Sequence, residues 1–195
     1  MKKAEVERCP WGSKEAAMMR YHDEEWGAPN HDDLRHFEFL VLEAAQAGLS
    51  WSTILNKREG YRAAYRGFDP ARVARFTARD VRRLLADEGI VRNRAKVASS
   101  ITNAKRFLEV QREFGSFDAY LWKWTGGKPV VNRWTVQSQI PPRTELSDSI
   151  SADLKKRGFS FVGSTIIYSH LQAVGVVNDH LVSCHRWKKL AGRRA

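Results

Sequence analysis

Residues 155–163, Lys-Lys-Arg-Gly-Phe-Ser-Phe-Val-Gly, carry the strongest indication of the architecture. Apolar residues recur at helical spacing before this segment, over residues 147–156, and after it, over residues 164–174. The segment is therefore predicted to be a tight turn between two helices. Glycines at its two ends, Gly158 and Gly163, allow backbone N–H groups to approach a ligand closely.

The second of these helices begins at Ser164 and Thr165, whose hydroxyls lie next to the free N–H groups of its first turn. A helix start of this kind binds anions, including a phosphate group. Arg157 and the two lysines before it add positive charge to the approach. An ordinary helix turn that ends at a glycine is the alternative for this segment taken alone.

The pattern is helical along most of the remaining chain. Helical apolar spacing runs from Leu34 to Ala45 and ends at Gly48. Further helices are predicted after Asp69-Pro70, after the capping box of Thr77 and Asp80 up to Gly89, over residues 93–114, and from Ser116 or Asp118. Residues 126–142 contain adjacent glycines and three prolines, which predicts a long irregular loop. The only β signal is Val130-Val131, too short to found a sheet, so an all-α fold is expected.

Length and composition indicate one globular unit. The chain has 195 residues, of which 43% are hydrophobic and 28% charged, as in an ordinary soluble protein. This composition excludes a collagen-like or disordered chain.

No apolar run is long enough to span a membrane. Charged residues follow the first lysines in place of an apolar leader, so we expect a cytoplasmic protein.

The charge balance points to a polyanionic partner. Lysine and arginine exceed aspartate and glutamate by 33 to 22, which gives a net charge of +11. Many small proteins are basic for other reasons, so charge alone does not establish nucleic-acid binding. The segment after Cys184 carries five cations and no acid: Arg186, Lys188, Lys189, Arg193 and Arg194. A solvated terminus or a phosphate-binding arm would both explain it.

Two cysteines and two histidines near the chain ends form a candidate metal site. Cys9 and His22 are separated by 12 residues, and His180 and Cys184 are spaced like neighbours on one helical turn. Two cysteines and two histidines complete the tetrahedral coordination of a structural zinc ion, although their spacing here is not that of a zinc finger. Such a site would join the two termini and would leave no position open for water. Two buried thiols and two hydrogen-bonded histidines are the alternative.

Glu43 lies inside an apolar helical segment. A carboxylate in such a position is paired with a cation, protonated or functional. The segment Tyr21–Gly27 is dense in polar and aromatic groups and, with Trp11, could line a flat pocket. The seven tryptophans of the chain would suit stacking on a nucleobase, although most tryptophans, including the one at Trp51, are explained by core packing. The corner at Gly48-Leu49 also has an ordinary interpretation, as a helix stop followed by a core residue.

Five motifs in order resemble a known family. They are Cys9-Pro-Trp11, Tyr21-His-Asp-Glu-Glu-Trp-Gly27, Gln46-Ala-Gly-Leu-Ser-Trp51, the segment 155–163 and Val177-Asn-Asp-His-Leu-Val-Ser-Cys184. Together they resemble the DNA-3-methyladenine glycosylase I family, within the helix-hairpin-helix glycosylase superfamily, over residues 8–184. The resemblance implies a single unit over residues 1–195. A zinc-clipped lobe would comprise residues 1–30 and 175–184, and a helical body residues 31–174. The body would contain the helix-hairpin-helix at 147–174, and residues 185–195 would form a basic tail.

The resemblance also implies roles for individual residues. One structural zinc ion would be bound by Cys9, His22, His180 and Cys184. Glu43, Tyr21 and Trp51 would form the catalytic pocket and bind the base, together with Trp11. Gly48-Leu49 would fill the gap left by an extruded nucleotide. The DNA backbone would be contacted by Arg157, Gly158, Gly163, Ser164 and Thr165.

The implied activity is hydrolysis of the N-glycosidic bond of N3-methyladenine in duplex DNA, by a monomer acting on the bacterial nucleoid. The superfamily's catalytic aspartate maps onto Asn178. Asp179 is displaced by one residue, which on a helix turns a side chain by about 100°. No lysine occurs in residues 164–177, so lyase activity is not expected. The alternatives are a catalytically silent DNA-binding module and a zinc hydrolase or deaminase; the second would need an open metal position.

Overall fold

The computed structural model describes residues 6–13 and 15–192. The main helices are α1 (Ala16–Glu24), α2 (Asp33–Gln46), α3 (Trp51–Asn56), α4 (Arg58–Ala64), α5 (Pro70–Val73), α6 (Ala78–Ala86), α7 (Arg94–Phe114), α8 (Phe117–Trp122), α9 (Glu145–Lys156), α10 (Ser164–Ala173) and α11 (His185–Ala191). Shorter 3₁₀ turns are η1 (Pro10–Ser13), η2 (Arg66–Phe68), η3 (Lys123–Thr125) and η4 (Gln137–Gln139). The strands are β1 (Val130–Val131) and β2 (Val177–Asn178).

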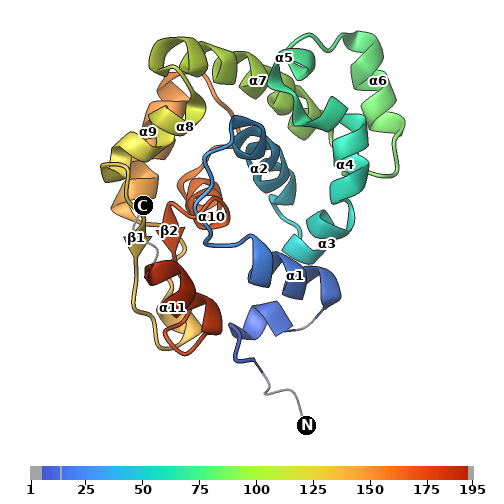
Figure 1. The fold of residues 1–195 in the computed structure, drawn as a ribbon. Helices are drawn as coiled ribbons and strands as arrows, with labels where there is room; N and C mark the ends of the chain where they lie inside the picture. Colours follow the sequence, from blue (N-terminus) through green and yellow to red (C-terminus); the bar gives the residue numbers. More distant parts are fainter. Residues whose placement is uncertain (1–5, 14, 193–195) are drawn as a thin grey trace.

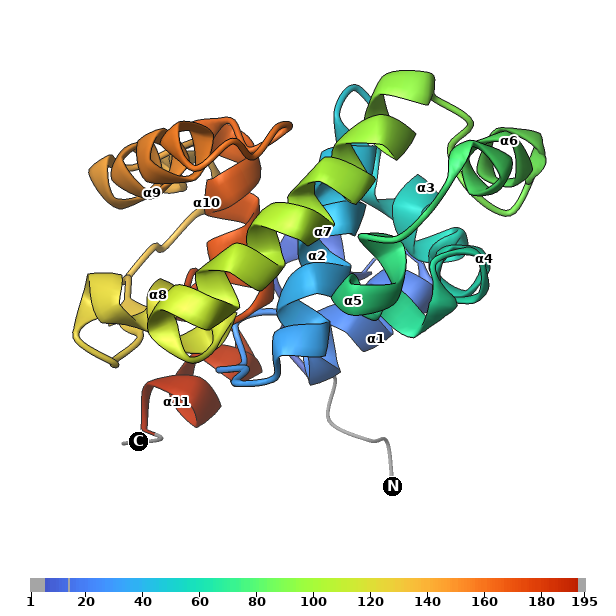
Figure 2. The same ribbon diagram turned by 90° about the horizontal axis from the view of Figure 1, so that it is seen from above.

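Helix α2 lies at the centre of the molecule, with α7 crossing it and α10 beside it (Figures 1 and 2). Residues 36–45 of α2 are all buried, because α3, α7, α8 and α10 pack around the helix. The Asp32 carboxylate starts the helix by accepting a hydrogen bond from the N–H of Leu34, at 3.0 Å. The helix ends at Gln46, and Gly48 turns the chain away with a φ of +77°. The side chains of residues 36–45 therefore face protein or a cavity on every side of the helix.

Capping residues set most of the predicted helix boundaries. Asn93 accepts from the N–H of Lys96 and starts α7 where expected. Pro70 occupies the first turn of α5, and Thr77 forms the predicted capping box with Asp80. Of the two starts considered for α8, the structure uses Ser116, whose hydroxyl accepts from the N–H of Ala119. Helix α6 ends at Ala86, before the predicted stop at Gly89.

Helices α9 and α10 pack against each other across the tight turn predicted from residues 157–163. Gly158 adopts a φ of +89°, which reverses the chain after α9. The Asn103 side chain of α7 braces the turn by pairing with both backbone polar groups of Ser160, at 2.8 and 2.9 Å. The Ser151 hydroxyl donates to the carbonyl of Val162. The turn is thus held rigidly, with α10 starting immediately after it.

The expectation of a purely helical fold needs one correction. Val130 and Val131 pair in parallel with Val177 and Asn178, so the long loop 126–142 is tied to the segment after α10. The Val130 N–H donates to the Val176 carbonyl at 2.9 Å. A ladder of two residues joins segments far apart in the chain and has no periodicity to detect, so the sequence pattern could not predict it.

The expected basic tail is also different. Residues 185–191 form α11, in which Arg186 and Leu190 are buried, and Trp187 donates through its indole N–H to the carbonyl of Asn132. A solvated, frayed terminus is therefore wrong for residues 185–191, because the apolar side of this helix packs onto the protein. Phosphate binding by the basic segment stays a prediction. Arg193 and Arg194 lie outside the described residues. No helix in the described ranges is long and apolar enough to cross a membrane.

His170 on α10 is fully buried against α2. Neither ring nitrogen has a hydrogen-bond partner among the described residues, and the His36 ring lies 5.9 Å away. Burial, with a smaller contribution from His36, holds the pKa of His170 well below its ordinary value. The protonated form is thus strongly disfavoured in the folded state.

This burial predicts an acid-sensitive fold. The unfolded chain takes up a proton on this residue near pH 6.5, but the folded chain does not, so stability present above that pH is lost as the pH falls. His170→Met should flatten this loss when the free energy of unfolding is measured by urea titration between pH 7 and pH 5. The neighbouring Leu171, which is also fully buried, provides the control, because Leu171→Met removes no titratable group and should keep the wild-type slope. Equal slopes for wild type and His170→Met would refute the assignment.

Candidate functional site

A cavity of about 350 Å³ opens between η1, α1, the C-terminal part of α2, α3 and α10. Its walls contain all four residues expected to form the pocket: Tyr21, Glu43, Trp51 and Trp11. Further lining residues are Met18, Trp26, Gln46, Gln137, Ile140, Ser169 and Gln172. Apart from Trp26, which belongs to the segment 21–27 expected to line a pocket, sequence reasoning missed these residues. Ser169 and Gln172 share one face of α10 at a spacing of three residues, which helical periodicity could have indicated.

Glu43 is only 4% exposed, and no described side chain pairs with it or donates a hydrogen bond to it. Burial alone raises the pKa of this carboxyl to about 8. The neighbouring arginines are engaged elsewhere. Arg58 binds Glu25 and Glu38 at 2.9 Å, so the ordinary interpretation, a glutamate neutralised by arginine, does not hold for Glu43.

Aromatic rings form the walls beside this carboxyl. Tyr21 lies between the other rings, with its centroid 5.4 Å from Trp51 and 6.2 Å from Trp11. The Trp51 indole is stacked on Phe39, with an angle of 24° between the ring planes. Burial, and then the charge of Glu43, raises the pKa of Tyr21 well above its usual value, so its hydroxyl stays neutral. The arrangement suits a flat, aromatic and positively charged ligand.

The corner after α2 projects beside the pocket. Leu49 is 41% exposed, and Gly48 has open space around its Cα. The Lys96 ammonium fixes the corner by donating to the carbonyls of Ala45 and Ala47, at 2.8 and 2.7 Å. A second cavity joins this corner to Thr165 on the first turn of α10 and shares Glu43 with the main pocket. The corner and the start of α10 therefore flank the same opening.

The first turn of α10 fits the expected anion site. Gly163 precedes it with a φ of −60°, and a Cβ at this position would meet nothing within 4 Å. Thr165 is exposed, whereas the Ser164 hydroxyl is hydrogen-bonded to Ser147, at 2.8 Å. The turn is therefore open to the outside at Thr165, and the phosphate contact stays a prediction.

Arg157 lies at the opposite end of the turn from Gly163. Its guanidinium binds Glu113 and Asp153, both at 2.6 Å, and lies over the rings of Phe114 and Tyr120. The positive charge of this guanidinium is therefore already balanced by two carboxylates of the protein. A backbone contact from Arg157 stays a prediction, and the structure favours a role in holding α9 against α7 and α8. Gly158 faces the side chain of Arg106.

Cys9, His22, His180 and Cys184 converge in a fully buried cluster whose ligand atoms all lie within 4.8 Å of one another. The Sγ of Cys184 lies 3.5 Å from both His22 Nε2 and His180 Nδ1, and the Sγ of Cys9 lies 3.7 Å from His180 Nδ1. Sulfur and nitrogen ligands of a tetrahedral zinc ion lie about 3.5 Å apart, given the usual bond lengths. The group can hold a metal ion.

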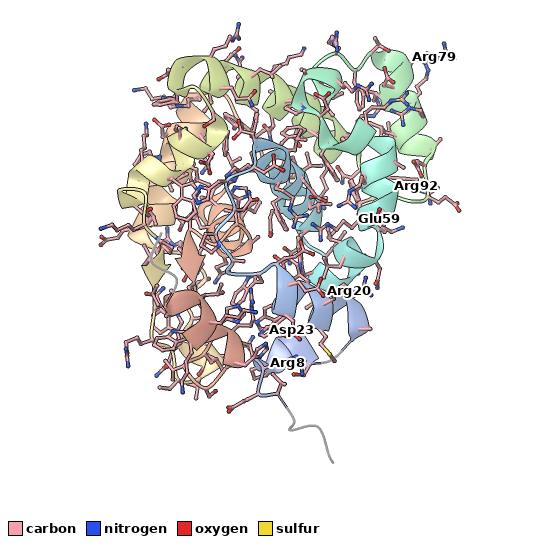
Figure 3. All side chains as sticks on the ribbon, in the orientation of Figure 1. Arg8, Arg20, Asp23, Glu59, Arg79 and Arg92 are labelled. Carbon is pink, nitrogen blue, oxygen red and sulfur yellow. The ribbon has the colours of Figure 1, made fainter. Side chains whose placement is uncertain are left out.

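The other nitrogen of each histidine is held by an acceptor. His22 Nδ1 donates to Asp23 Oδ1 at 2.8 Å, and His180 Nε2 donates to the carbonyl of Trp26 at 2.9 Å. Arg8 in turn binds Asp23 at 2.7 Å, and the two side chains lie together near the chain start (Figure 3). These bonds turn His22 Nε2 and His180 Nδ1 toward the Sγ of Cys184, which is the usual arrangement of histidines around a bound metal.

The helical geometry expected between His180 and Cys184 is wrong. The segment follows strand β2 and forms a turn, in which the N–H of Cys184 donates to the carbonyl of Leu181. Asn178 belongs to β2, so the shift from Asn178 to Asp179 is a step along extended chain and reverses the side-chain direction. Neither residue lines the pocket. Asn178 instead accepts from the N–H of His180.

Known proteins share this architecture over nearly the whole chain. Residues 11–187 match the family model described as methyladenine glycosylase. The chain is 47% identical to "DNA-3-methyladenine glycosylase 1" of Escherichia coli (strain K12) over 92% of its length and 96% of that protein. It is 42% identical to "DNA-3-methyladenine glycosylase" of Haemophilus influenzae, over 91% and 96%. A solved structure from Staphylococcus aureus, concerned with 3-methyladenine recognition, superposes with a TM-score of 0.90 at 34% identity, covering 96% of this chain and 98% of that one. The chain belongs to the methyladenine glycosylase family.

Proposed function

We propose that the protein is a monofunctional DNA-repair glycosylase that hydrolyses the N-glycosidic bond of N3-methyladenine in duplex DNA. The observation that carries this proposal is the buried, unpaired carboxylate of Glu43 in an aromatic pocket. The named activity of the E. coli relative and the 3-methyladenine recognition studied in the S. aureus structure support the same substrate. The products are the free base and an abasic site.

The chemistry suits a site that has no strong acid. Adenine methylated at N3 carries a positive charge while it is attached to the sugar. When the N-glycosidic bond breaks, the bonding electron pair moves onto the ring and the base leaves neutral. Water adds to the sugar carbon and releases a proton to solvent. No general acid has to protonate the leaving group.

The protein contributes selection and orientation. Trp51 stacks on the ring of the flipped base, and such a contact favours a cationic ring. Glu43, once ionised, attracts the same charge and accepts a hydrogen bond from the exocyclic amine. Tyr21 and Trp11 complete the walls. A normal, neutral base gains less from this pocket, which is how the enzyme discriminates against it.

To extrude the base, the protein has to bind the DNA backbone firmly. We propose that a phosphate binds to the N–H groups of the first turn of α10, at Gly163, Ser164 and Thr165, as in a helix-hairpin-helix. Leu49 enters the stack in place of the extruded nucleotide. The net charge of +11 assists approach to DNA, and arginines such as Arg79 and Arg92 project outward from α6 and the loop after it (Figure 3).

We propose that zinc is the metal bound by Cys9, His22, His180 and Cys184. Two thiolates and two imidazoles are the preferred set for this ion, and four protein ligands make the site structural. A zinc hydrolase would need an open ligand position, which this set does not leave. Because residues 164–177 contain no lysine that could form a Schiff base, hydrolysis without strand cleavage follows.

Glu43→Gln tests the pocket. The variant should keep zinc and DNA binding but lose most excision, measured as release of 3-methyladenine from alkylated DNA in single-turnover experiments. Glutamine keeps the size and one acceptor oxygen but loses the charge. The exposed Glu24 gives the matched control, because Glu24→Gln should excise at the wild-type rate. Full activity of Glu43→Gln would remove the carboxylate from the mechanism.

The same substitution should stabilise the free protein. The pKa of Glu43 is about 8 when folded, against an ordinary value of 4.5, so the folded state holds a proton that the unfolded chain has released. Stability contributed by this group therefore falls as the pH rises from about 4.5 to about 8. Urea unfolding at pH 8 should show Glu43→Gln to be more stable than wild type. A less stable variant would contradict the burial argument.

The metal proposal predicts one zinc ion per chain in protein purified without chelators, measured by elemental analysis. Cys184→Ser should lose the metal and unfold at a lower temperature, because the site joins residues near both ends of the chain. His185, the histidine next to this cysteine, supplies the control, and His185→Gln should retain zinc. Metal-free wild-type protein with unchanged thermal stability would rule the site out.

Gly163→Ala tests the phosphate contact without disturbing the fold, since a Cβ there meets nothing within 4 Å. The methyl group should obstruct close approach of a phosphate. We expect about tenfold weaker DNA affinity, comparable to losing one charge-assisted hydrogen bond. Fluorescence anisotropy at several salt concentrations measures this, with Gly192→Ala as the control. Unchanged affinity would place the backbone contact elsewhere.

A further inference from the structure

Asp179 is a fully buried carboxylate whose surroundings the proposed function does not explain. It follows β2 and is 0% exposed. Its Oδ1 accepts hydrogen bonds from Asn132 and from the indole of Trp134, each at 2.7 Å. Its Oδ2 accepts from the hydroxyl of Tyr168 and from the amide of Gln172. All four partners are uncharged donors, so no cation lies among the described hydrogen-bond partners of this group.

Gln172 connects this carboxylate to the pocket. Its amide nitrogen donates to Asp179 Oδ2 at 2.7 Å, and its side chain lines the same cavity as Glu43 and Trp51. The amide nitrogen faces Asp179 in this hydrogen bond, so the amide oxygen faces away from it. The oxygen has no partner among the described residues. Asp179 therefore determines which end of the amide is left for a ligand.

The backbone around Gln172 is also fixed. Its carbonyl accepts from the N–H of Gly27 at 2.8 Å, which ties the end of α10 to the chain after α1. Gly175 lies so close to Ala28 that a Cβ on it would fall 2.2 Å from the Ala28 carbonyl carbon. The side chain of Gln172 thus starts from a rigid position, and its amide orientation is set at the other end by Asp179.

We propose that Gln172 contacts the flipped base and that Asp179 is its positioning residue, an inference that rests on the proposed function. The oriented amide oxygen accepts a hydrogen bond from the exocyclic amine of N3-methyladenine, beside the bond to Glu43. Guanine carries an acceptor oxygen where adenine carries this amine, so two acceptors in the pocket disfavour N3-methylguanine.

The inference is tested by the affinity for free 3-methyladenine and by the ratio of excision rates for N3-methyladenine and N3-methylguanine. Gln172→Met should lower the affinity about tenfold, the loss expected for one hydrogen bond to a charged group. It should also lower the excision ratio. Tyr168→Phe is the matched control, because it removes a donor to the same oxygen of Asp179 from the same helix and leaves the pocket walls unchanged.

A double-mutant cycle distinguishes positioning from simple stabilisation. If Asp179 acts through Gln172, the effects of Asp179→Asn and Gln172→Met on affinity should not add. Should Asp179→Asn fail to fold, the comparison of Gln172→Met with Tyr168→Phe still decides. Wild-type affinity and excision ratio in Gln172→Met would overturn the inference. Wild-type protein that releases no 3-methyladenine would instead refute the proposed function.

Discussion

The burial of Glu43 without a cation is the constraint on which the site depends. Helix α2 carries this carboxyl into the centre of the protein, where ionising it is costly, and its pKa rises to about 8. Three arginines lie near the same helix, but Glu25 and Glu38 bind them. The fold thereby keeps positive charge away from the pocket. A ligand that brings its own positive charge relieves the cost, and a neutral base does not.

The buried cluster of cysteines and histidines lies next to the pocket in sequence and in space. Trp11 follows Cys9 of this cluster by two residues, and Tyr21 immediately precedes its His22. The packing of the two chain ends around the cluster therefore also places two aromatic walls of the cavity. On the other side, α10 places Thr165 of its first turn beside the corner after α2, and it places Gln172 in the pocket wall. The proposed contacts to the DNA backbone and to the base would thus come from opposite ends of one short helix.

The sequence predicted the elements that local chemistry determines. Caps at Asn93, Ser116 and Thr77 set helix starts, and a charged residue inside an apolar helix identified Glu43. The resemblance supplied the metal ligands and the aromatic residues, and the structure brings each set together. Contacts between segments that are far apart in the sequence could not be predicted in this way. The ion pair of Arg157 with Glu113, the β1–β2 ladder and the packing of α11 all join residues that no local pattern relates. From the sequence, Asp179 was recognised only as an aspartate one position away from the superfamily's catalytic aspartate. Its buried surroundings could not be predicted, because its four hydrogen-bond donors come from two other parts of the chain.

A direct NMR titration of the Glu43 side-chain carboxyl gives the most decisive test of this account, in the free protein and with a stable cationic N3-alkylated adenine bound. The pKa of Glu43 should be about 8 in the free protein, and it should fall clearly when the cation binds, since the cation favours the ionised carboxylate. A carboxyl that titrates near 4.5 in the free protein, or one whose pKa does not change when the cation binds, would contradict it.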